Sequence, residues 1–298
     1  MQTLDCCPVC SAVTSERVYA APTTRGQDKK LWSVFECSAC SHQFMNPQPS
    51  WEDLKPYYTA AYDPYNPDHG RLVDDSEALA DARQSGRLRH IDLPVDKKIL
   101  DVGCGAGYFL RLAKKLGAIE QGVEPSEYAT SIAKTQGLNV FCGTLEEFAV
   151  HTDEKFNVIT SNHVIEHVPN PVETLATMKS LLAPEGFIWI SVPNAAYPIS
   201  KSLNGLWHSA DLPYHLMHFS PKSMALAGHK AGLKTRKQVT ESIPRIVEAS
   251  LGQYLRYRWM LPRKITHATG ILKPIANWYA RRADAKTNGE AIITEFIA

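Results

Sequence analysis

Three glycines follow an apolar run at alternate positions in "ILDVGCGAGYFL": Gly103, Gly105 and Gly107. A glycine-rich turn after a strand is typical of nucleotide sites, because the backbone can approach the ligand closely. Dinucleotide sites use GxGxxG, whereas here Tyr108 stands where the third glycine of that motif belongs. Asp101, two residues before the first glycine, would repel a pyrophosphate and would suit a ligand that carries positive charge.

S-adenosylmethionine carries an ammonium and a sulfonium and no phosphate, so the acid favours it over NAD or ATP. The next strand-like run ends at Glu124 in "QGVEPS", where a carboxylate can accept two hydrogen bonds from ribose hydroxyls. NAD sites share this feature, so it supports a nucleoside but not S-adenosylmethionine specifically. The third ends before "CGTLEEF", which can lie along an adenine ring with Glu146 as a polar neighbour. The predicted cofactor-binding residues are Asp101, Gly103, Cys104, Gly105, Gly107, Glu124, Pro125, Gly143, Thr144, Leu145 and Asn162.

The elements that must position these residues alternate in type from residue 93 onward. Strand-like runs are "KKILDVG", "IEQGVEP", "LNVFCG", "FNVITS" and "GFIWISVP", and helix-like runs are "GYFLRLAKKLG", "SEYATSIAKTQG" and "PVETLATMKSLLAP". Strands separated by helix-length segments predict a parallel sheet with right-handed crossovers. Ligands bind outside the carboxyl ends of such strands, which is where all three candidate loops fall.

Four cysteines form two CxxC pairs near the N-terminus, separated by 26 residues. Each pair places two thiolates on one tight turn, and two such turns make a closed tetrahedral zinc site. The strand-like runs "ERVYA" and "LWSVFEC" lie between the pairs. We therefore predict a zinc ribbon over residues 1–50 with structural zinc, the alternatives being unrelated thiol pairs or iron. We expect Cys6 to be a bystander, the alternative being that it competes with Cys7. The predicted metal ligands are Cys7, Cys10, Cys37 and Cys40.

Several stretches resemble class I S-adenosylmethionine-dependent methyltransferases: "ILDVGCGAG", "GVEPS", "GTLEEF", "FNVITSNHVIEHVPNP" and "LLAPEGFIWISVPN". The "EHVPNP" segment resembles the branch that contains ubiquinone-pathway and sugar methyltransferases, as do "YHLMHFSPKSM" and "AGHKAGLKTRKQV". The resemblance implies an α/β, Rossmann-like, doubly wound sheet of seven strands, whose last strand, "GEAIITEFIA", is antiparallel.

Histidines follow the fourth strand-like run in "NHVIEHV". An alcohol acceptor must lose its proton during methyl transfer, and histidine is the usual base. His163 and His167 are four apart and would share a face of a helical turn, although no third ligand for a metal is evident. The resemblance, more than the spacing, points to His167 as the base and to Glu166 as the residue that orients it or lines the site.

A later loop, "WHSADLPYHLMHF", adds His208, His215 and His218, which we expect to overhang the acceptor. The alternative for each histidine is a structural, hydrogen-bonded role. The predicted catalytic residues are His167, Glu166, His163 and His215.

Residues 51–92 look helical and rich in aromatic residues, and we expect them to form a lid or linker with Tyr57, Tyr58 and Tyr62 closing over the site. The third predicted unit is the methyltransferase domain, residues 93–298. It contains a basic helical insert at about 243–287, with nine Lys or Arg against two acids. The insert also contains Trp259 and Trp278. The insert is either a solvated basic face, a site for a phosphate-bearing acceptor or a peripheral membrane contact.

Charge separates the classes of acceptor. The whole chain of 298 residues carries a net charge of +1, and the segment between the cysteine pairs also sums to +1, a poor footprint for RNA. We therefore expect O-methylation of a sugar, glycan or other small molecule. An rRNA base methyltransferase and a non-catalytic S-adenosylmethionine-binding protein are the alternatives. With neither an apolar signal core nor a membrane-length apolar run, the protein is expected in the cytoplasm.

Overall fold

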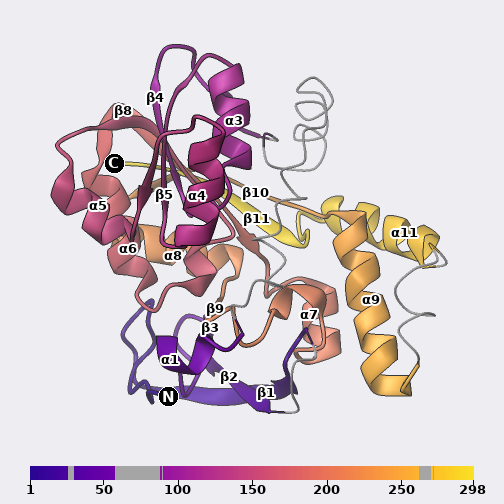
Figure 1. Cartoon of the computed structure of the whole chain (residues 1–298). Helices are drawn as coiled ribbons and strands as arrows, with labels where there is room; N and C mark the ends of the chain where they lie inside the picture. The colour runs from indigo at the N-terminus through magenta and orange to yellow at the C-terminus, as the bar shows by residue number, and fades with distance from the viewer. Residues whose placement is uncertain (26–29, 58–87, 89, 262–269, 271) are drawn as a thin grey trace.

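The computed structural model describes residues 1–25, 30–57, 88, 90–261, 270 and 272–298. Its main feature is a seven-stranded sheet in the order β10-β11-β8-β7-β4-β5-β6 (Figure 1). The strands are β4 Lys98–Val102, β5 Ile119–Glu124, β6 Val140–Cys142, β7 Phe156–Asn162, β8 Leu182–Pro193, β10 Lys234–Glu241 and β11 Ala291–Ile297. Strands β4 to β8 run parallel, whereas β11 is antiparallel to both β8 and β10, as predicted.

Helices cover the sheet in two groups. Helices α3 Tyr108–Lys115 and α4 Glu127–Thr135 contact β4, β5 and β6. Helices α5 Leu145–His151, α6 Pro171–Ser180 and α8 Pro221–Lys230 pack in a row, and α6 and α8 contact β8, β10 and β11. Capping boxes at Thr144 and Ser220 start α5 and α8, because each hydroxyl accepts a hydrogen bond from the third residue of its helix.

The central strands read as apolar runs because both of their faces are covered. Leu100, Ile159 and Ile190 are fully buried, and so is the ring of Trp189. Strand β4 pairs with β5 on one side and with β7 on the other. The chain first winds outward from β4 through β5 and β6, and then returns to add β7 on the opposite side of β4, so its direction of winding reverses there. Ligands of open α/β sheets bind at the carboxyl edge beside such a reversal.

A second, four-stranded sheet has the order β1-β2-β3-β9 and lies at the base of the view in Figure 1. Its first three strands are β1 Ser15–Pro22, β2 Leu31–Cys37 and β3 Gln43–Met45, followed by the short helix α1 Trp51–Leu54. The fourth, β9 Met217–His218, comes from far along the chain, between β8 and β10. The N-terminal sheet is thus completed by a strand from the predicted methyltransferase region.

Further helices flank the carboxyl edge: η3 Ile165–His167, α7 Pro198–Leu203, η4 His208–Ala210, α9 Pro244–Trp259 and α11 Lys273–Asp284. Helices α9 and α11 pack on each other at the side of the sheet where β10 and β11 lie (Figure 1). In the described part of the chain, no helix is both long and apolar enough to cross a bilayer.

Candidate functional site

The glycine turn lies at the carboxyl end of β4, the central strand. Gly103, Gly105 and Gly107 have φ values of 70°, 54° and 84°, a region that side chains rarely adopt. A Cβ on Gly103 would overlap Val164, whereas at Gly105 no other atom would lie within 4 Å. The turn therefore packs against the segment after β7 and leaves open space over its middle, where a ligand can approach the backbone.

Two carboxylates surround this turn. Glu124 is 6% exposed; its Oε2 accepts the Gly105 amide at 3.0 Å and its Oε1 accepts the Ser126 amide at 2.9 Å. Asp101 is 5% exposed, and its Oδ1 accepts the Thr160 hydroxyl at 2.7 Å. Burial raises the pKa of Glu124. Burial, and then the charges of Asp101 and Glu124, raise the pKa of the Cys104 thiol far above its ordinary value. Two buried carboxyl groups therefore lie beside the turn, where a positively charged ligand would stabilise their ionised forms.

The third predicted loop joins the same edge. The Gly143 amide donates to the Glu124 carbonyl at 3.1 Å, so the ends of β5 and β6 are tied together. Leu145 is buried, whereas Thr144 is exposed and uses its hydroxyl to cap α5. Glu146 accepts the Thr174 hydroxyl at 3.3 Å. Asn162, at the end of β7, and Pro125, after β5, complete the rim on which the sequence placed the cofactor.

This rim fits S-adenosylmethionine. Buried carboxylates with an open glycine turn suit an ammonium, a sulfonium and ribose hydroxyls, and Asp101, directly before the turn, disfavours a pyrophosphate. The buried hydroxyl of Ser161, at the end of β7, has no hydrogen-bond partner among the described residues. A polar ligand at this edge would give it one.

The second part of the site is a cluster of Glu166, His167 and His215. The sequence predicts each residue but not their contact, since His215 comes from the loop after η4. One ligand atom from each of the three lies within 4.8 Å of the others, and the rings of His167 and His215 are 4.7 Å apart in an edge-to-face arrangement. Glu166 Oε1 is 3.9 Å from His215 Nε2 and 3.1 Å from His163 Nδ1.

Backbone carbonyls fix the tautomers of the two clustered histidines. His167 Nδ1 donates to the Tyr214 carbonyl at 2.9 Å, and His215 Nδ1 donates to the Ser209 carbonyl at 2.9 Å. Each Nε2 is then a free base with its lone pair available. Burial is the largest of the effects that hold the pKa of His215 well below its ordinary value, so this ring is neutral at physiological pH.

Glu166, the acid of the cluster, is 1% exposed. Its Oε2 has no hydrogen-bond partner in the part of the chain that the structure describes. Two imidazole Nε2 atoms and one carboxylate are also ligands that divalent cations accept. The sequence revealed no third metal ligand beside His163 and His167. In the structure His215, from a distant loop, lies next to Glu166 and His167 and completes a set of three.

The sequence predicts that His163 and His167 share one face of a helical turn, and the structure differs from this prediction. The helical turn is a 3₁₀-helix that begins at Ile165, and His163 precedes it with a left-handed φ of 56°. His163 therefore reaches Glu166, its side chain 48% exposed, whereas His167 packs on His215.

The other predicted loop residues lie in different surroundings. His208 is exposed on η4, whereas His218 is 3% exposed inside β9. The Tyr57 carbonyl accepts the Tyr214 hydroxyl at 2.7 Å. Tyr58 and Tyr62 lie outside the described residues, as does most of the predicted lid.

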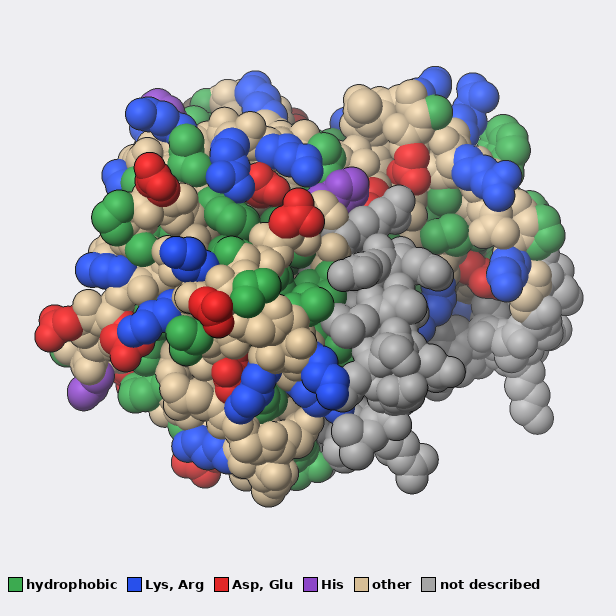
Figure 2. Space-filling view, turned by 90° about the horizontal axis from the view of Figure 1, so that it is seen from above, with side chains coloured by type: hydrophobic (Ala, Val, Ile, Leu, Met, Phe, Trp, Pro, Cys, Tyr) green, Lys and Arg blue, Asp and Glu red, His purple; other side chains and the backbone are tan. Residues whose placement is uncertain are grey.

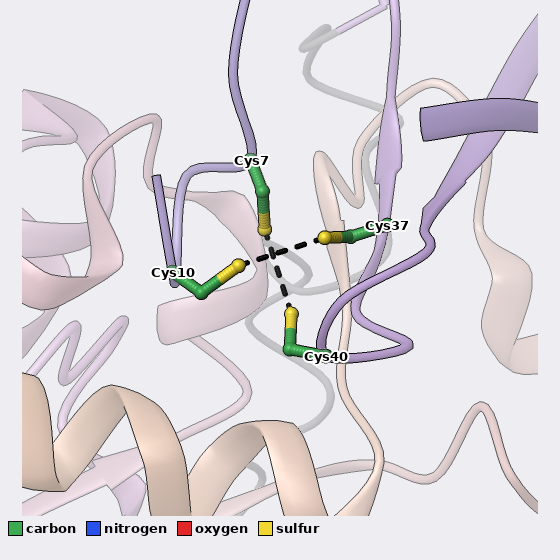
Figure 3. A group of neighbouring side chains, drawn as sticks. All are labelled: Cys7, Cys10, Cys37 and Cys40. Atoms are coloured by element: carbon green, nitrogen blue, oxygen red, sulfur yellow. Dashed lines mark hydrogen bonds between the residues drawn. The ribbon is translucent and has the colours of Figure 1, made fainter. Parts of the chain in front are cut away.

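The four predicted metal ligands converge at the N-terminal sheet, where their side chains point toward one another (Figure 3). The Cys7–Cys40 and Cys10–Cys37 sulfur distances are 3.7 Å and 3.5 Å, and all four sulfurs lie within 4.8 Å of one another as free thiols. Cys6 is exposed and outside this group.

The two cysteine turns share one backbone pattern. Ser11 and Ser41, which follow the second cysteine of each pair, have left-handed φ values of 63° and 60°. Their amides donate to the carbonyls of Cys7 and Cys37 at 2.9 Å and 2.8 Å. Repetition of so specific a turn is typical of metal-binding knuckles.

Comparisons with known proteins agree with the fold. Residues 59–238, more than half of the chain, match the family described as a methyltransferase domain. A ubiquinone biosynthesis O-methyltransferase of Saccharophagus degradans is 31% identical over 150 residues, which cover 48% of this chain and 57% of that protein. One of the same description from Histophilus somni is 39% identical over 113 residues, covering 34% and 47%. The chain thus spans about half the length of the curated relatives it matches.

A solved structure supports the same architecture. It is a chain of the complex between the Haloferax volcanii Trm112 methyltransferase activator and a putative methyltransferase. The TM-score is 0.50 at 17% identity, with 75% of this chain and 92% of that chain covered. Sheet order and family match therefore lead to one conclusion: the chain belongs to the class I S-adenosylmethionine-dependent methyltransferases.

Proposed function

We propose that the protein transfers a methyl group from S-adenosylmethionine to a hydroxyl of a small-molecule or glycan acceptor. The observation that carries the proposal is the position of the base cluster. The glycine turn packs on Val164 through Gly103, and Val164 is followed within three residues by Glu166 and His167. Cofactor groups and candidate acceptor groups therefore share one edge of the sheet.

The cofactor would be held by the residues predicted for it. Glu124 would accept hydrogen bonds from the ribose, Asp101 would face the positive charge, and the loop at Gly143 to Leu145 would line the adenine. When bound, S-adenosylmethionine supplies a methyl group on a positively charged sulfur. The protein's main task in this reaction is to orient the two reactants.

His167 is the proposed general base. Its Nδ1 is engaged by the Tyr214 carbonyl, which leaves Nε2 to take the proton of a hydroxyl. His215 has the same tautomer, but its burial disfavours the imidazolium, so it is the poorer base. Glu166 would stabilise the charge that develops on His167. The names of the relatives, ubiquinone biosynthesis O-methyltransferases, support oxygen as the methylated atom.

A divalent cation on Glu166, His167 and His215 is the second candidate for this cluster. The partnerless Oε2 of Glu166 favours it. Turnover that survives a chelator, in protein whose N-terminal metal is retained, would support the histidine base. Turnover that is lost and then restored by a divalent cation would transfer the role to the cation.

We also propose that Cys7, Cys10, Cys37 and Cys40 bind one structural zinc ion. Zn–S bonds of about 2.3 Å in a tetrahedron place sulfurs about 3.8 Å apart, close to the observed 3.5 Å and 3.7 Å. Four thiolates fill every coordination position, so this zinc would leave none for a substrate.

The charge of the surface and the basic residues of the insert bear on the class of acceptor. On the face seen in Figure 2, Lys and Arg side chains are interspersed with acids over much of the described surface. Such a surface gives little attraction to RNA, so an rRNA base is the less favoured acceptor. Arg256, Arg258, Arg281 and Arg282 on α9 and α11 could serve a phosphate-bearing acceptor or a peripheral membrane contact.

The proposal further includes three units, residues 1–50, 51–92 and 93–298, and a cytoplasmic location. A transfer assay tests the function: the protein is incubated with methyl-labelled S-adenosylmethionine and a panel of sugars, glycans, phenols and rRNA. Label on a hydroxyl of a small acceptor supports the proposal. Label on rRNA alone, or cofactor binding without transfer to any acceptor, would favour one of the two alternatives.

A further inference from the structure

The segment that carries His215 is attached to the N-terminal module, defined as residues 1–50. Strand β9 pairs with β3, with Phe44 opposite Met217 and Gln43 opposite His218. Phe44 and Met217 are each 1% exposed, so the contact is a packed one. In Figure 1, β9 lies beside β3, and it forms the edge of the four-stranded sheet.

Two hydrogen bonds in series extend from this module to the candidate base cluster. The Met45 amide donates to the Leu216 carbonyl at 2.8 Å, and the Leu216 amide donates to the Glu166 carbonyl at 2.8 Å. Leu216 is also the residue directly after His215. Leu216 therefore connects the module, through Met45 at the end of β3, to both Glu166 and His215.

The other end of the same segment is also held by the module. The Thr24 amide donates to the Leu212 carbonyl at 2.9 Å, and the Leu212 amide donates to the Thr24 hydroxyl at 2.9 Å. Arg25 donates two hydrogen bonds to Asp211, at 3.0 Å and 2.7 Å, and lies 4.6 Å from the ring centroid of Tyr214. Residues 211–218 are thus fixed at both ends, by the segment after β1 and by β3.

The module's own order depends on its cysteine turns. Strand β3 has three residues and begins three positions after Cys40, and the second turn is closed by the Cys37 amide, which donates to the His42 carbonyl at 2.9 Å. So short a strand has little stability alone. In small four-cysteine modules, the free energy of metal binding is also free energy of folding.

We propose that the N-terminal module is a positioning device for the acceptor side of the site, and that its metal-supported fold sets where His215 and Glu166 stand. The inference rests on the proposed zinc site and on the proposed role of the cluster. Zinc then acts on the site at a distance, through β3, Leu216 and the Glu166 backbone, and contacts neither reactant.

Hydrogen exchange on the full-length protein tests this without knowledge of the acceptor. Exchange is followed by mass spectrometry in zinc-loaded protein, after removal of zinc, and after zinc is added back, with zinc content measured in each sample. We expect amides of residues 163–168 and 211–219 to exchange about tenfold faster or more without zinc, and to recover when it returns. Amides of β4 and β7 should keep their protection.

Two outcomes would overturn the proposal. In one, faster exchange is confined to residues 1–50. In the other, freshly purified protein holds no metal and yet residues 211–219 are fully protected. Neither outcome depends on methyl transfer, so failure of this inference is distinguishable from failure of the proposed function.

A pair of variants separates positioning from general loss of structure. Arg25→Met removes the contacts with Asp211 and Tyr214, whereas Arg17→Met removes an exposed arginine from β1 and serves as the control. The readout is the imidazole nitrogen NMR spectrum, which reports the Nδ1–H tautomer of His215. We expect Arg25→Met alone to shift this signal, with zinc content and S-adenosylhomocysteine affinity preserved. Identical spectra in both variants would contradict the inference.

Discussion

Glu124 shows how much of the cofactor site rests on one residue. Its carboxylate accepts the amides of Gly105 and Ser126, so it shapes the glycine turn as well as offering acceptors to a ribose. Glu124→Ala should weaken S-adenosylmethionine binding by about 1–3 kcal/mol, because hydrogen bonds to a charged acceptor are lost. Glu124→Gln keeps one carbonyl acceptor and should lose less. Calorimetric titration measures both, with exposed Glu127→Ala as the control; three equal affinities would refute the assignment.

The two clustered histidines should respond differently to substitution. His167→Ala should lower kcat by about 10²–10⁴-fold with little change in cofactor affinity, the usual size of a lost general base. His215→Ala should act mainly on the KM of the acceptor, since its buried ring is the poorer proton acceptor. Steady-state kinetics on the identified acceptor give both constants, and His151→Ala, at the exposed end of α5, is the control. A full loss at position 215 with near-normal turnover at 167 would move the base to the loop.

A buried acid next to β11 predicts a pH effect on stability. Glu290 is 4% exposed and accepts the Ser209 hydroxyl at 2.7 Å, and burial raises its pKa from 4.5 to about 7. The folded state therefore holds this proton to higher pH than the unfolded state, so the group's contribution to stability falls as pH rises from about 4.5 to 7. The loss is complete about one pH unit above the folded-state pKa.

Glu290→Gln should remove that loss, because the amide stays neutral and its carbonyl can still accept from Ser209. The variant should be more stable than the wild type at pH 8, by on the order of 2–3 kcal/mol, and should show little gain at pH 4.5. Urea unfolding at both pH values measures the difference. The same difference at both would show that Glu290 does not titrate as described.

At the scale of elements, the four-cysteine turns predict a metal-dependent fold. The protein should contain one zinc per chain by elemental analysis, and Cys37→Ser should lose it and unfold the small sheet, since metal binding supplies folding free energy. Cys6→Ser is the matched control, because Cys6 is exposed and lies outside the sulfur cluster. Zinc near zero in fresh, reduced wild-type protein would exclude the site, and equal loss in both variants would exclude this ligand set.

Local pattern made the sheet and its loops predictable. Strand β4 with its glycine turn, helix α3 and the acid that ends β5 are encoded by contiguous residues, so periodicity and turn chemistry suffice. The antiparallel last strand was foreseen only through the family resemblance. The short turns around Cys7 and Cys37 were also predictable, because each CxxC pair, like the glycine turn, is formed by contiguous residues.

Contacts between distant segments were not predictable. The sequence around Met217 does not indicate that this residue pairs with Phe44, because a strand of two residues is too short to show an alternation of apolar and polar residues. The meeting of His215 with Glu166 depends on that pairing. The expected shared face of His163 and His167 failed because His163 adopts a left-handed φ and the 3₁₀-helix starts only at Ile165.

The whole molecule places two chemistries on one edge of one sheet. On one side of the point where the winding reverses, the ends of β4, β5 and β6 carry the buried acids Asp101 and Glu124 and the glycine turn. On the other, the turn after β7 and the loop that precedes β9 gather histidines, and the N-terminal sheet lies beneath them (Figure 1). This division would let cofactor and acceptor approach from neighbouring loops, as an in-line methyl transfer requires.

The claim on which all of this depends is that the glycine turn holds a positively charged nucleoside and not a pyrophosphate. Calorimetric titration of the wild-type protein with S-adenosylmethionine and, separately, with NAD tests it most directly. We predict one S-adenosylmethionine bound per chain and no heat from NAD, because the buried carboxylate of Asp101 lies beside the turn where a pyrophosphate would have to bind. Glu124 could bind the ribose of either ligand and does not distinguish them. Binding of NAD together with no binding of S-adenosylmethionine would contradict the account.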